Sequence, residues 1–296
     1  MKLLIFGAGV IGSFYVTKFS EAGFNVTLLA RGQRLSYLQK NGLRYKSSNT
    51  IKTANVKVIH ELEDGMYYDF IFITVKEHQL NDALLQIRNN VSPSIVTMVN
   101  SLTPYYEYEK IVGKGRILPA FPGAGGRLID GVLDARATPS FIQKTTFSEV
   151  DGQETERVRI LSNLFKKSKI PSKFIRGMYS WQICHVALVV PLAMAYYKTD
   201  SPEKVGHNRL VMRETSKQLR VNFKLLKQKG VIISPKKLSF FRFCPKLVLS
   251  WGLGMVYSSQ FGKNFMFYHS MNAPGEMYAL QTQLNDFYDK AWDKVK

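Results

Sequence analysis

The sequence predicts two domains, an α/β domain with a parallel β-sheet followed by an all-helical domain. Two observations predict this organisation. In the first half of the chain, short apolar runs alternate with helically spaced stretches, which is typical of a parallel sheet covered by helices on both faces. After Pro171 the sequence consists mostly of long helical patterns. Prolines interrupt those patterns at Pro202, Pro235, Pro245 and Pro274. The change in texture falls within 170–177, and we therefore divide the chain into domains 1–172 and 173–296.

The expected strands of the first domain are apolar runs of four to seven residues. They are Leu3–Phe6, Asn25–Ala30, Asp69–Val75, Ile95–Val99 and Arg116–Ala120. Helical spacing of apolar residues occurs in the stretches between and after these runs. The expected helices are Ser13–Ala22, Gln33–Lys40, Leu80–Arg88 and Asp151–Lys169.

A glycine motif joins the first expected strand to the first expected helix, and it reads Gly7-Ala8-Gly9-Val10-Ile11-Gly12. This spacing in this context is typical of a Rossmann-type dinucleotide-binding turn. Gly7 permits the tight turn, Gly9 lets the backbone approach a pyrophosphate, and Gly12 lets the helix pack closely on the strand. The pyrophosphate is then expected at the positive end of the helix that begins near Val10. The alternative is a glycine-rich turn without a ligand.

The end of the second expected strand indicates which dinucleotide binds. NAD-binding proteins place an Asp or Glu there to accept hydrogen bonds from the ribose 2′-hydroxyl. The stretch Leu28–Arg34 contains no carboxylate, and Arg31 lies nineteen residues after Gly12. A guanidinium at this position suits the 2′-phosphate of NADP(H), with Arg34 as a second contributor. A solvated surface charge is the alternative for each arginine.

Composition limits the classes of protein that fit. The chain has 296 residues, 45% of them hydrophobic, which excludes intrinsic disorder. Its two cysteines cannot form a disulfide framework, and with no convincing signal-peptide cleavage site before Lys18 we expect a cytoplasmic location. The net charge of +19 suits nucleic acid, a membrane surface or anionic small ligands. The basic residues are dispersed without a recognisable DNA- or RNA-binding motif, so no nucleic-acid partner is expected.

One stretch is long enough to span a bilayer, because Gly177–Tyr197 contains no charged residue. It does contain Ser180, Gln182, His185 and Pro191. A central helix of a helical domain has the same hydrophobic character. We therefore expect a buried core helix and no membrane span.

Several motifs together resemble the ketopantoate reductase (2-dehydropantoate 2-reductase) family. They are 7–12, Leu29-Ala30-Arg31-Gly32, Thr74-Val75-Lys76-Glu77-His78-Gln79, Val99-Asn100, and a Trp181 helix leading to Val190-Pro191-Leu192-Ala193. The resemblance is specific in the first half and loose in the last hundred residues. It implies an N-terminal Rossmann domain that binds NADPH, a C-terminal helical domain for substrate and dimerisation, and a cofactor in the cleft between them.

The resemblance also assigns residues in the first domain. Lys76 is similar to the family's lysine facing the cofactor, and Asn100 to the asparagine beside the nicotinamide. Ala124, in Pro122-Gly123-Ala124-Gly125-Gly126, lies where the family's loop passes the cofactor. Lys76 and Asn100 also follow expected strands at the edge where open parallel sheets bind ligands, and glycines permit close backbone approach. A surface lysine, a turn asparagine and an ordinary glycine loop are the alternatives.

The second domain departs from the family at the position of greatest chemical importance. Family members carry a lysine two residues after a tryptophan, which protonates the ketone oxygen, whereas this chain reads Trp181-Gln182-Ile183-Cys184-His185. His185, one helical turn after Gln182, is a candidate replacement because imidazole titrates near neutral pH; a hydrogen-bonded core histidine is the alternative. Glu276 is a candidate for the family's late glutamate, or a first-turn carboxylate that favours the helix dipole.

Together with the glycine motif and Arg31, the resemblance implies an NADPH-dependent reductase of a small anionic 2-oxo acid. The resemblance implies ketopantoate, reduced to pantoate in pantothenate biosynthesis, with Asn100, His185 and Glu276 as candidate catalytic residues. The alternative is a protein of the same fold that binds NADP(H) as a sensor with altered or lost catalysis. No metal site is predicted. The oligomeric state, monomer or homodimer, stays open.

Overall fold

The computed structural model describes residues 1–62 and 65–289. The chain forms two compact units. The first contains Met1–Asn100 and Pro104–Met178, and the second contains Ser101–Thr103 and the chain from Tyr179 onward. The chain therefore enters the second unit briefly after residue 100 before it returns to finish the first.

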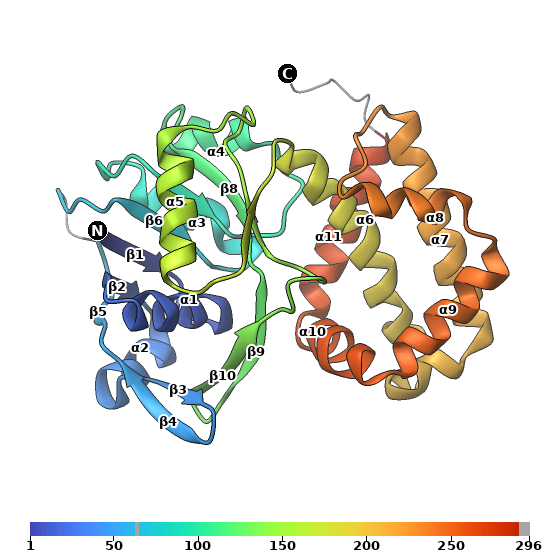
Figure 1. Cartoon of the computed structure of the whole chain (residues 1–296), viewed down its shortest axis with the longest axis horizontal. Helices are drawn as coiled ribbons and strands as arrows, with labels where there is room; N and C mark the ends of the chain where they lie inside the picture. The colour runs from blue at the N-terminus through green and yellow to red at the C-terminus, as the bar shows by residue number, and fades with distance from the viewer. Residues whose placement is uncertain (63–64, 290–296) are drawn as a thin grey trace. The chain divides into compact units, whose positions relative to one another are not determined.

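The first unit is built on an eight-stranded sheet with the order β12-β11-β8-β7-β6-β1-β2-β5 (Figure 1). Its strands are β1 (Lys2–Phe6), β2 (Asn25–Leu29), β5 (Lys57–Ile59), β6 (Phe70–Ile73), β7 (Ile95–Thr97), β8 (Ile117–Phe121), β11 (Thr145–Phe147) and β12 (Ser172–Phe174). The strands β8, β7, β6, β1, β2 and β5 are neighbours in this order and run parallel, as predicted. The sheet is nevertheless mixed, because β11 runs antiparallel to β8. The five predicted strands are confirmed, and the α/β class with them.

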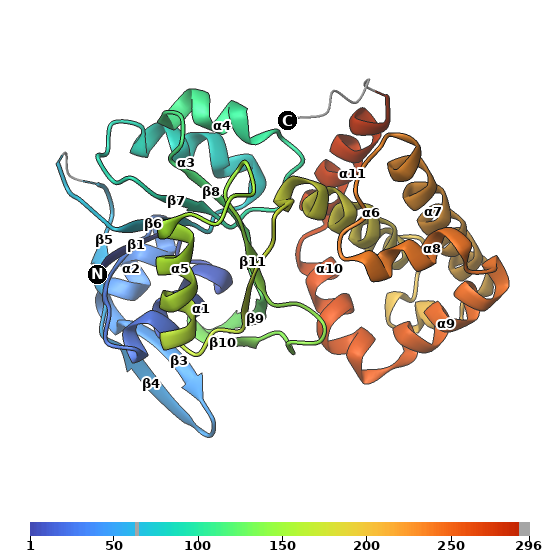
Figure 2. The same ribbon diagram turned by 45° about the horizontal axis from the view of Figure 1, so that its top comes forward.

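Helices cover both faces of this sheet (Figure 2). They are α1 (Val10–Glu21), α2 (Gly32–Asn41), α3 (Leu80–Ile87), α4 (Tyr105–Val112) and α5 (Glu156–Lys167). On one face, Phe19 of α1 and Phe165 of α5 pack on Phe72 of β6, with ring centroids 5.1–6.2 Å apart. The helix α5 is shorter than the predicted 151–169 because Thr155 caps it, its Oγ1 accepting the backbone N–H of Val158.

A second sheet of four strands was not predicted. Its strands are β3 (Leu43–Ser47), β4 (Thr50–Ala54), β9 (Ala124–Ile129) and β10 (Val132–Ala137), in the order β4-β3-β10-β9. The turn between β9 and β10 uses Asp130 and Gly131, both at positive φ, as short hairpin turns require. Helix α1 contacts strands of both sheets and so joins them.

The second unit is helical, as predicted. Its helices are α6 (Met178–Tyr197), α7 (Arg209–Gln228), α8 (Phe240–Phe243), α9 (Lys246–Ser258), α10 (Tyr268–Asn272) and α11 (Pro274–Asp289), with 3-10 turns at Pro202–His207 and Lys236–Ser239 and a π-helical turn at Gly262–Phe267. Only α6 among the described residues has the length and composition of a membrane span, and 67% of that window is buried inside the protein. Burial of this extent is what a core helix shows.

The excursion Ser101–Thr103 is held inside the second unit. Leu102 is buried in its apolar core. The backbone N–H of Leu102 donates to Oε1 of Gln283 at 2.8 Å, and the Tyr179 hydroxyl donates to the carbonyl of Leu102 at 2.8 Å. Both backbone groups of this residue are therefore satisfied by side chains of helices that lie far away in the sequence.

Candidate cofactor site

The glycine turn lies where the strand order of the main sheet reverses. Strand β1 pairs with β2 on one side and with β6 on the other. Chain connections leave in opposite directions from this point, which opens a crevice at the carboxyl ends of the strands. Gly7 directly follows β1, and Thr74 directly follows β6. The fold therefore places the predicted motif at the ligand-binding edge of an open parallel sheet.

Two of the three motif glycines are required by protein packing. Gly7 has a φ of +115°, and its carbonyl accepts a hydrogen bond from Oγ1 of Thr74 at 2.9 Å. A β-carbon added at Gly12 would lie 1.9 Å from that same carbonyl oxygen. No side chain larger than hydrogen fits such a gap. Gly12 thus lets the first turn of α1 rest directly on the end of β1.

Gly9 faces open space, since a β-carbon added there meets nothing within 4 Å. It caps α1, and the first helical hydrogen bond runs from the N–H of Ser13 to the Gly9 carbonyl at 2.9 Å. The N–H groups of Val10, Ile11 and Gly12 therefore precede the intrahelical ladder. Donors at a helix N-terminus next to a bare backbone form a site suited to phosphate oxygens.

Arg31 stands two residues after the end of β2 and is the N-cap of α2. Its guanidinium carbon lies 5.2 Å from the ring centroid of Phe6, the last residue of β1. Its Nη2 donates to Oε1 of Gln86, a neutral acceptor. Within the described residues no carboxylate pairs with Arg31. An exposed cation after β2 that no described carboxylate neutralises is suited to an anionic group of a ligand.

Arg34 is committed to the protein itself. Its Nε donates to the carbonyl of Ala8 at 3.1 Å, and its Nη1 donates to the carbonyl of Gly131 at 2.7 Å. Partial burial lowers the pKa of the Arg34 guanidinium, against an opposing effect of Tyr37. Arg34 therefore ties the glycine turn to the β9–β10 hairpin, and the suggestion that it assists at a 2′-phosphate has no support in this geometry.

Lys76 and Asn100 follow neighbouring strands, β6 and β7. Lys76 is exposed, and its backbone N–H donates to Oε1 of Gln79, which fixes the short 3-10 turn Glu77–Gln79 after it. The Oδ1 atom of Asn100 is buried without a hydrogen-bond partner among the described residues. An orphaned buried acceptor is costly and is usual where a ligand completes the bonding. The residues of this edge therefore fit a nicotinamide dinucleotide.

Ala124 begins β9, where it pairs with Ala137. Two of the glycines near it are required by packing, whereas a β-carbon added at Gly125 would meet nothing within 4 Å. A β-carbon at Gly123 would lie 2.3 Å from the backbone nitrogen of Thr145, and one at Gly126 would lie 2.3 Å from the carbonyl of Asp134. Close backbone approach is thus explained by strand packing at these two positions, and the expected contact of Ala124 with the cofactor stays a prediction.

The two candidate residues of the second unit have distinct surroundings. His185 is half-buried on α6, and its ring stacks on Trp181 with centroids 5.0 Å apart and planes at 9°. Glu276 is half-buried in the first turn of α11. Burial, and then the charges of Tyr278 and Glu276, raise the pKa of Tyr197 to about 12. Glu276 therefore lies close enough to act on Tyr197 electrostatically, and the catalytic roles of both residues stay predictions.

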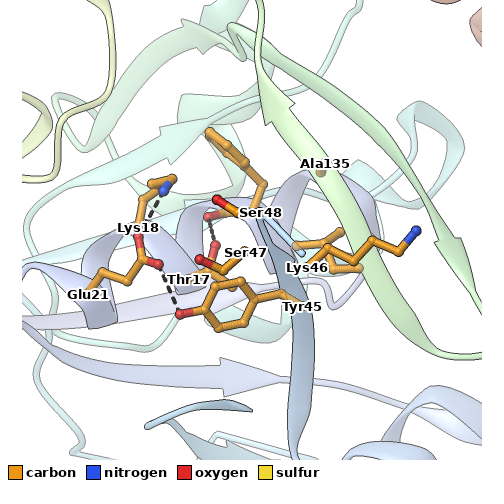
Figure 3. Close-up of a pocket in the computed structure, with 10 residues that line it drawn as sticks. Thr17, Lys18, Glu21, Tyr45, Lys46, Ser47, Ser48 and Ala135 are labelled. Carbon is orange, nitrogen blue, oxygen red and sulfur yellow. Dashed lines mark hydrogen bonds and ion pairs between the residues drawn. The ribbon is translucent and has the colours of Figure 1, made fainter. Parts of the chain in front are cut away.

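A separate hollow of about 210 Å³ lies between α1 and strands β3 and β10, at the far end of α1 from the glycine turn (Figure 3). Three of the polar side chains that line it, Lys18, Glu21 and Tyr45, bond to one another. Glu21 accepts from Lys18 at 2.8 Å and from the Tyr45 hydroxyl at 2.9 Å. Partial burial opposes these bonds, yet the pKa of Glu21 is lowered. None of the residues that line this hollow is a predicted site residue, and the hollow is not the candidate site.

Sequence reasoning missed the residues that support the site from behind. Thr74 packs against Gly7 and Gly12. The ring of Phe6 lies against the Arg31 guanidinium, and Gln86 accepts a hydrogen bond from Arg31. Only Thr74 gave a signal in the sequence, because it opens the motif that contains Lys76. The other two act through contacts that depend on which strands become neighbours.

The chain is similar to known reductases in sequence. Residues 3–141 match the family model described as Ketopantoate reductase PanE/ApbA. A 2-dehydropantoate 2-reductase of Mesorhizobium japonicum is 30% identical over 57% of this chain and 58% of its own length. An uncharacterized oxidoreductase of Bacillus subtilis is 28% identical over 57% of this chain and 55% of its own length. The matches thus span little more than half the length of these curated relatives.

Solved structures share the fold along nearly the whole chain. A PanE/ApbA family ketopantoate reductase from Ralstonia eutropha gives a TM-score of 0.62 at 15% identity, covering 98% of this chain and 99% of that one. A D-mandelate dehydrogenase with NADH and anilino(oxo)acetate gives a TM-score of 0.63 at 16% identity, covering 98% of both chains. At these identities the likeness concerns the fold alone.

Proposed function

We propose that the chain is a member of the ketopantoate reductase family, whose model matches residues 3–141, and that it is an oxidoreductase that uses NADP(H) to reduce a small 2-oxo acid. One observation carries the proposal. The glycine turn at the strand-order reversal presents the open backbone of Gly9 and the first amides of α1, with the uncompensated Arg31 at the end of the adjacent strand. A pyrophosphate and a 2′-phosphate are the groups for which these two features are complementary.

The preference for NADP(H) over NAD(H) rests on Arg31. The end of β2 lacks the carboxylate that binds a ribose 2′-hydroxyl, and a guanidinium stands there instead. Its stacking on Phe6 and its bond to Gln86 hold it at this edge without neutralising it. A charged donor held in this way favours the ligand with the additional phosphate.

The remaining residues of this edge bind and orient the reactants. The bound dinucleotide supplies hydride to the carbonyl carbon of the 2-oxo acid. Asn100 presents its buried Oδ1 as an acceptor for an amide N–H, which would fix the orientation of a carboxamide. Lys76, a cation at the carboxyl end of β6, attracts anionic groups to the same edge.

Reduction of a ketone also requires a proton at the carbonyl oxygen. The family's lysine is replaced at its position by Ile183, which is buried and has no proton to give. We assign the donor role to His185, whose ring is held by the Trp181 stack one turn further along α6. Glu276 is the second candidate, as a group that positions His185 or returns a proton to it. Ketopantoate as substrate, and with it a place in pantothenate synthesis, is part of this proposal.

The direct test is a panel of 2-oxo acids offered with NADPH and with NADH. It includes ketopantoate and phenylglyoxylate, the oxo acid corresponding to mandelate. We expect NADPH to be oxidised by at least one of them and NADH to be a poorer cofactor. Tight NADPH binding without oxidation by any member would reject the reductase and leave the sensor as the function. Absence of binding to either dinucleotide would reject both.

A further inference from the structure

More than half of the net positive charge of the chain comes from one part of the second unit, because that part contains no acidic residue. Residues 215–275 contain ten Lys and Arg and no Asp or Glu. This stretch of 61 residues therefore supplies ten of the +19 net charges. It covers most of α7, all of α8 and α9, and α10. Charge of this density without compensating acids produces a strong local positive potential.

Helix α9 within this stretch has two apolar faces, and only one of them is buried. Leu249, Ser250, Leu253 and Tyr257 point into the core of the second unit. Leu247, Val248, Trp251 and Met255 lie on the opposite side of the helix, and they are 51–69% exposed. A surface helix ordinarily carries polar residues at these positions. Four large apolar side chains in one exposed row indicate a binding surface.

The segment that leads into α9 also exposes aromatic rings and cations. Phe240 and Phe243 are 58% and 71% exposed, and Phe243 stands four residues before Leu247. In the sequence, the exposed cations Lys236 and Lys237 come before these rings and the exposed Lys246 comes after them. None of the three forms an ion pair within the part of the chain that the structure describes. We call the exposed residues of α9 with Phe240, Phe243 and these three lysines the α9 face.

We propose that the α9 face docks on the surface of a bilayer that contains anionic phospholipids. Exposed Trp, Phe and Leu beside unpaired lysines are the composition of segments that lie in a membrane interface. The aliphatic and aromatic side chains enter the boundary between headgroups and acyl chains, and the lysines meet the negative headgroups. The chain does not cross the bilayer in this arrangement.

Charge decides between this partner and the others. A second copy of the chain docking through the same face would bring identical lysines together, because a two-fold interface is self-complementary. Nucleic acid would satisfy the lysines but would leave Leu247, Val248 and Met255 against phosphates and water. An anionic bilayer satisfies both the lysines and the aliphatic row.

The test is co-sedimentation of the full chain with vesicles of phosphatidylcholine, with or without phosphatidylglycerol. We expect binding only to vesicles that contain phosphatidylglycerol, weakening as salt rises. The double variant Trp251→Ser/Met255→Ser should lose roughly tenfold or more in affinity. The triple variant Lys236→Gln/Lys237→Gln/Lys246→Gln should lose on the order of a hundredfold. Emission of Trp251 should shift to the blue on binding, and the shift should vanish in Trp251→Phe.

A matched control removes the same charge elsewhere. Lys40→Gln/Lys57→Gln/Lys114→Gln changes three exposed lysines of the first unit, and it should bind vesicles nearly as the unchanged protein does. Equal losses in the two triple variants would overturn the proposal, because total charge would then suffice. So would vesicle binding that the double variant keeps, a dimer that the double variant abolishes, or binding to duplex DNA that the double variant retains while no vesicle is bound. Thermal unfolding confirms that each variant is folded.

Discussion

Gly12 and Gly7 approach each other so closely that a β-carbon on Gly12 would stand 1.9 Å from the Gly7 carbonyl oxygen. Gly9 lies between them in the motif, and a β-carbon added at Gly9 would meet nothing within 4 Å. Within one motif, Gly12 is therefore needed for the fold, whereas Gly9 is left open for a ligand. That separation gives a first prediction about the cofactor site.

Gly12→Ala should destabilise the protein by roughly 2–3 kcal/mol, because the methyl group overlaps backbone that cannot move aside. Gly9→Ala should change the unfolding free energy by only about 0.5 kcal/mol, yet weaken NADPH binding at least tenfold, because the methyl group occupies the space left for the pyrophosphate. Urea unfolding and a fluorescence titration measure the two effects. Unimpaired NADPH binding by Gly9→Ala would show that the turn holds no pyrophosphate.

Arg31→Ala should discriminate between the two nicotinamide dinucleotides. A charge-assisted hydrogen bond contributes about 1.5–3 kcal/mol, so NADPH affinity should fall roughly tenfold to a hundredfold while NADH affinity changes little. Lys40→Ala, at the other end of α2, is the control for a general loss of positive charge and should leave both affinities unchanged. Parallel losses for NADPH and NADH would reject a 2′-phosphate contact.

His185→Gln tests the proton donor. The amide preserves size and hydrogen bonding but cannot deliver a proton, so kcat should fall roughly a hundredfold while NADPH affinity stays the same. His207→Gln, at an exposed histidine of the same unit, should have no effect. An unchanged kcat in His185→Gln would remove this residue from the mechanism and move attention to Glu276.

The Glu21 carboxylate makes stability depend on acid pH. Partial burial would raise its pKa, but hydrogen bonds from Lys18 and Tyr45 outweigh burial and lower it below the ordinary value of 4.5. A pKa lowered by folding adds stability above about 4.5 that is lost as pH falls through the folded-state pKa. Glu21→Gln should flatten this part of the acid limb in urea unfolding at several pH values. Tyr45→Phe, which keeps the carboxylate, should flatten it only in part, and an unchanged limb in both variants would contradict the assignment.

The main sheet was predictable because each inner strand is an apolar run, and such a run can be identified from its own residues without knowing which strand pairs with it. Strands β3 and β4 were not, because four of the five residues of β4 are exposed and its sequence resembles a polar loop. The antiparallel strand β11 has three residues, too few for a pattern, and nothing in them encodes direction. Local sequence reports burial, whereas pairing depends on residues far away in the chain.

The site shows the same limit. Arg31 and Arg34 are three residues apart, and the sequence predicts both as candidates for the 2′-phosphate. Arg34 is occupied by the carbonyls of Ala8 and Gly131, the second 97 residues away in sequence, so no local pattern could distinguish the two. The glycine motif was readable because its chemistry is local, since strand, turn and helix follow one another directly.

The excursion Ser101–Thr103 has a consequence for dissecting the chain. A fragment that starts at Tyr179 would resemble the second unit on a linear map, yet it would lack Leu102, which fills part of the core. It would also leave Oε1 of Gln283 and the hydroxyl of Tyr179 without the backbone groups they bind. No single cut in the chain separates the two units. The tripeptide Ser101–Thr103 interrupts the sequence of the first unit and completes the core of the second, so the folding of the two units is coupled.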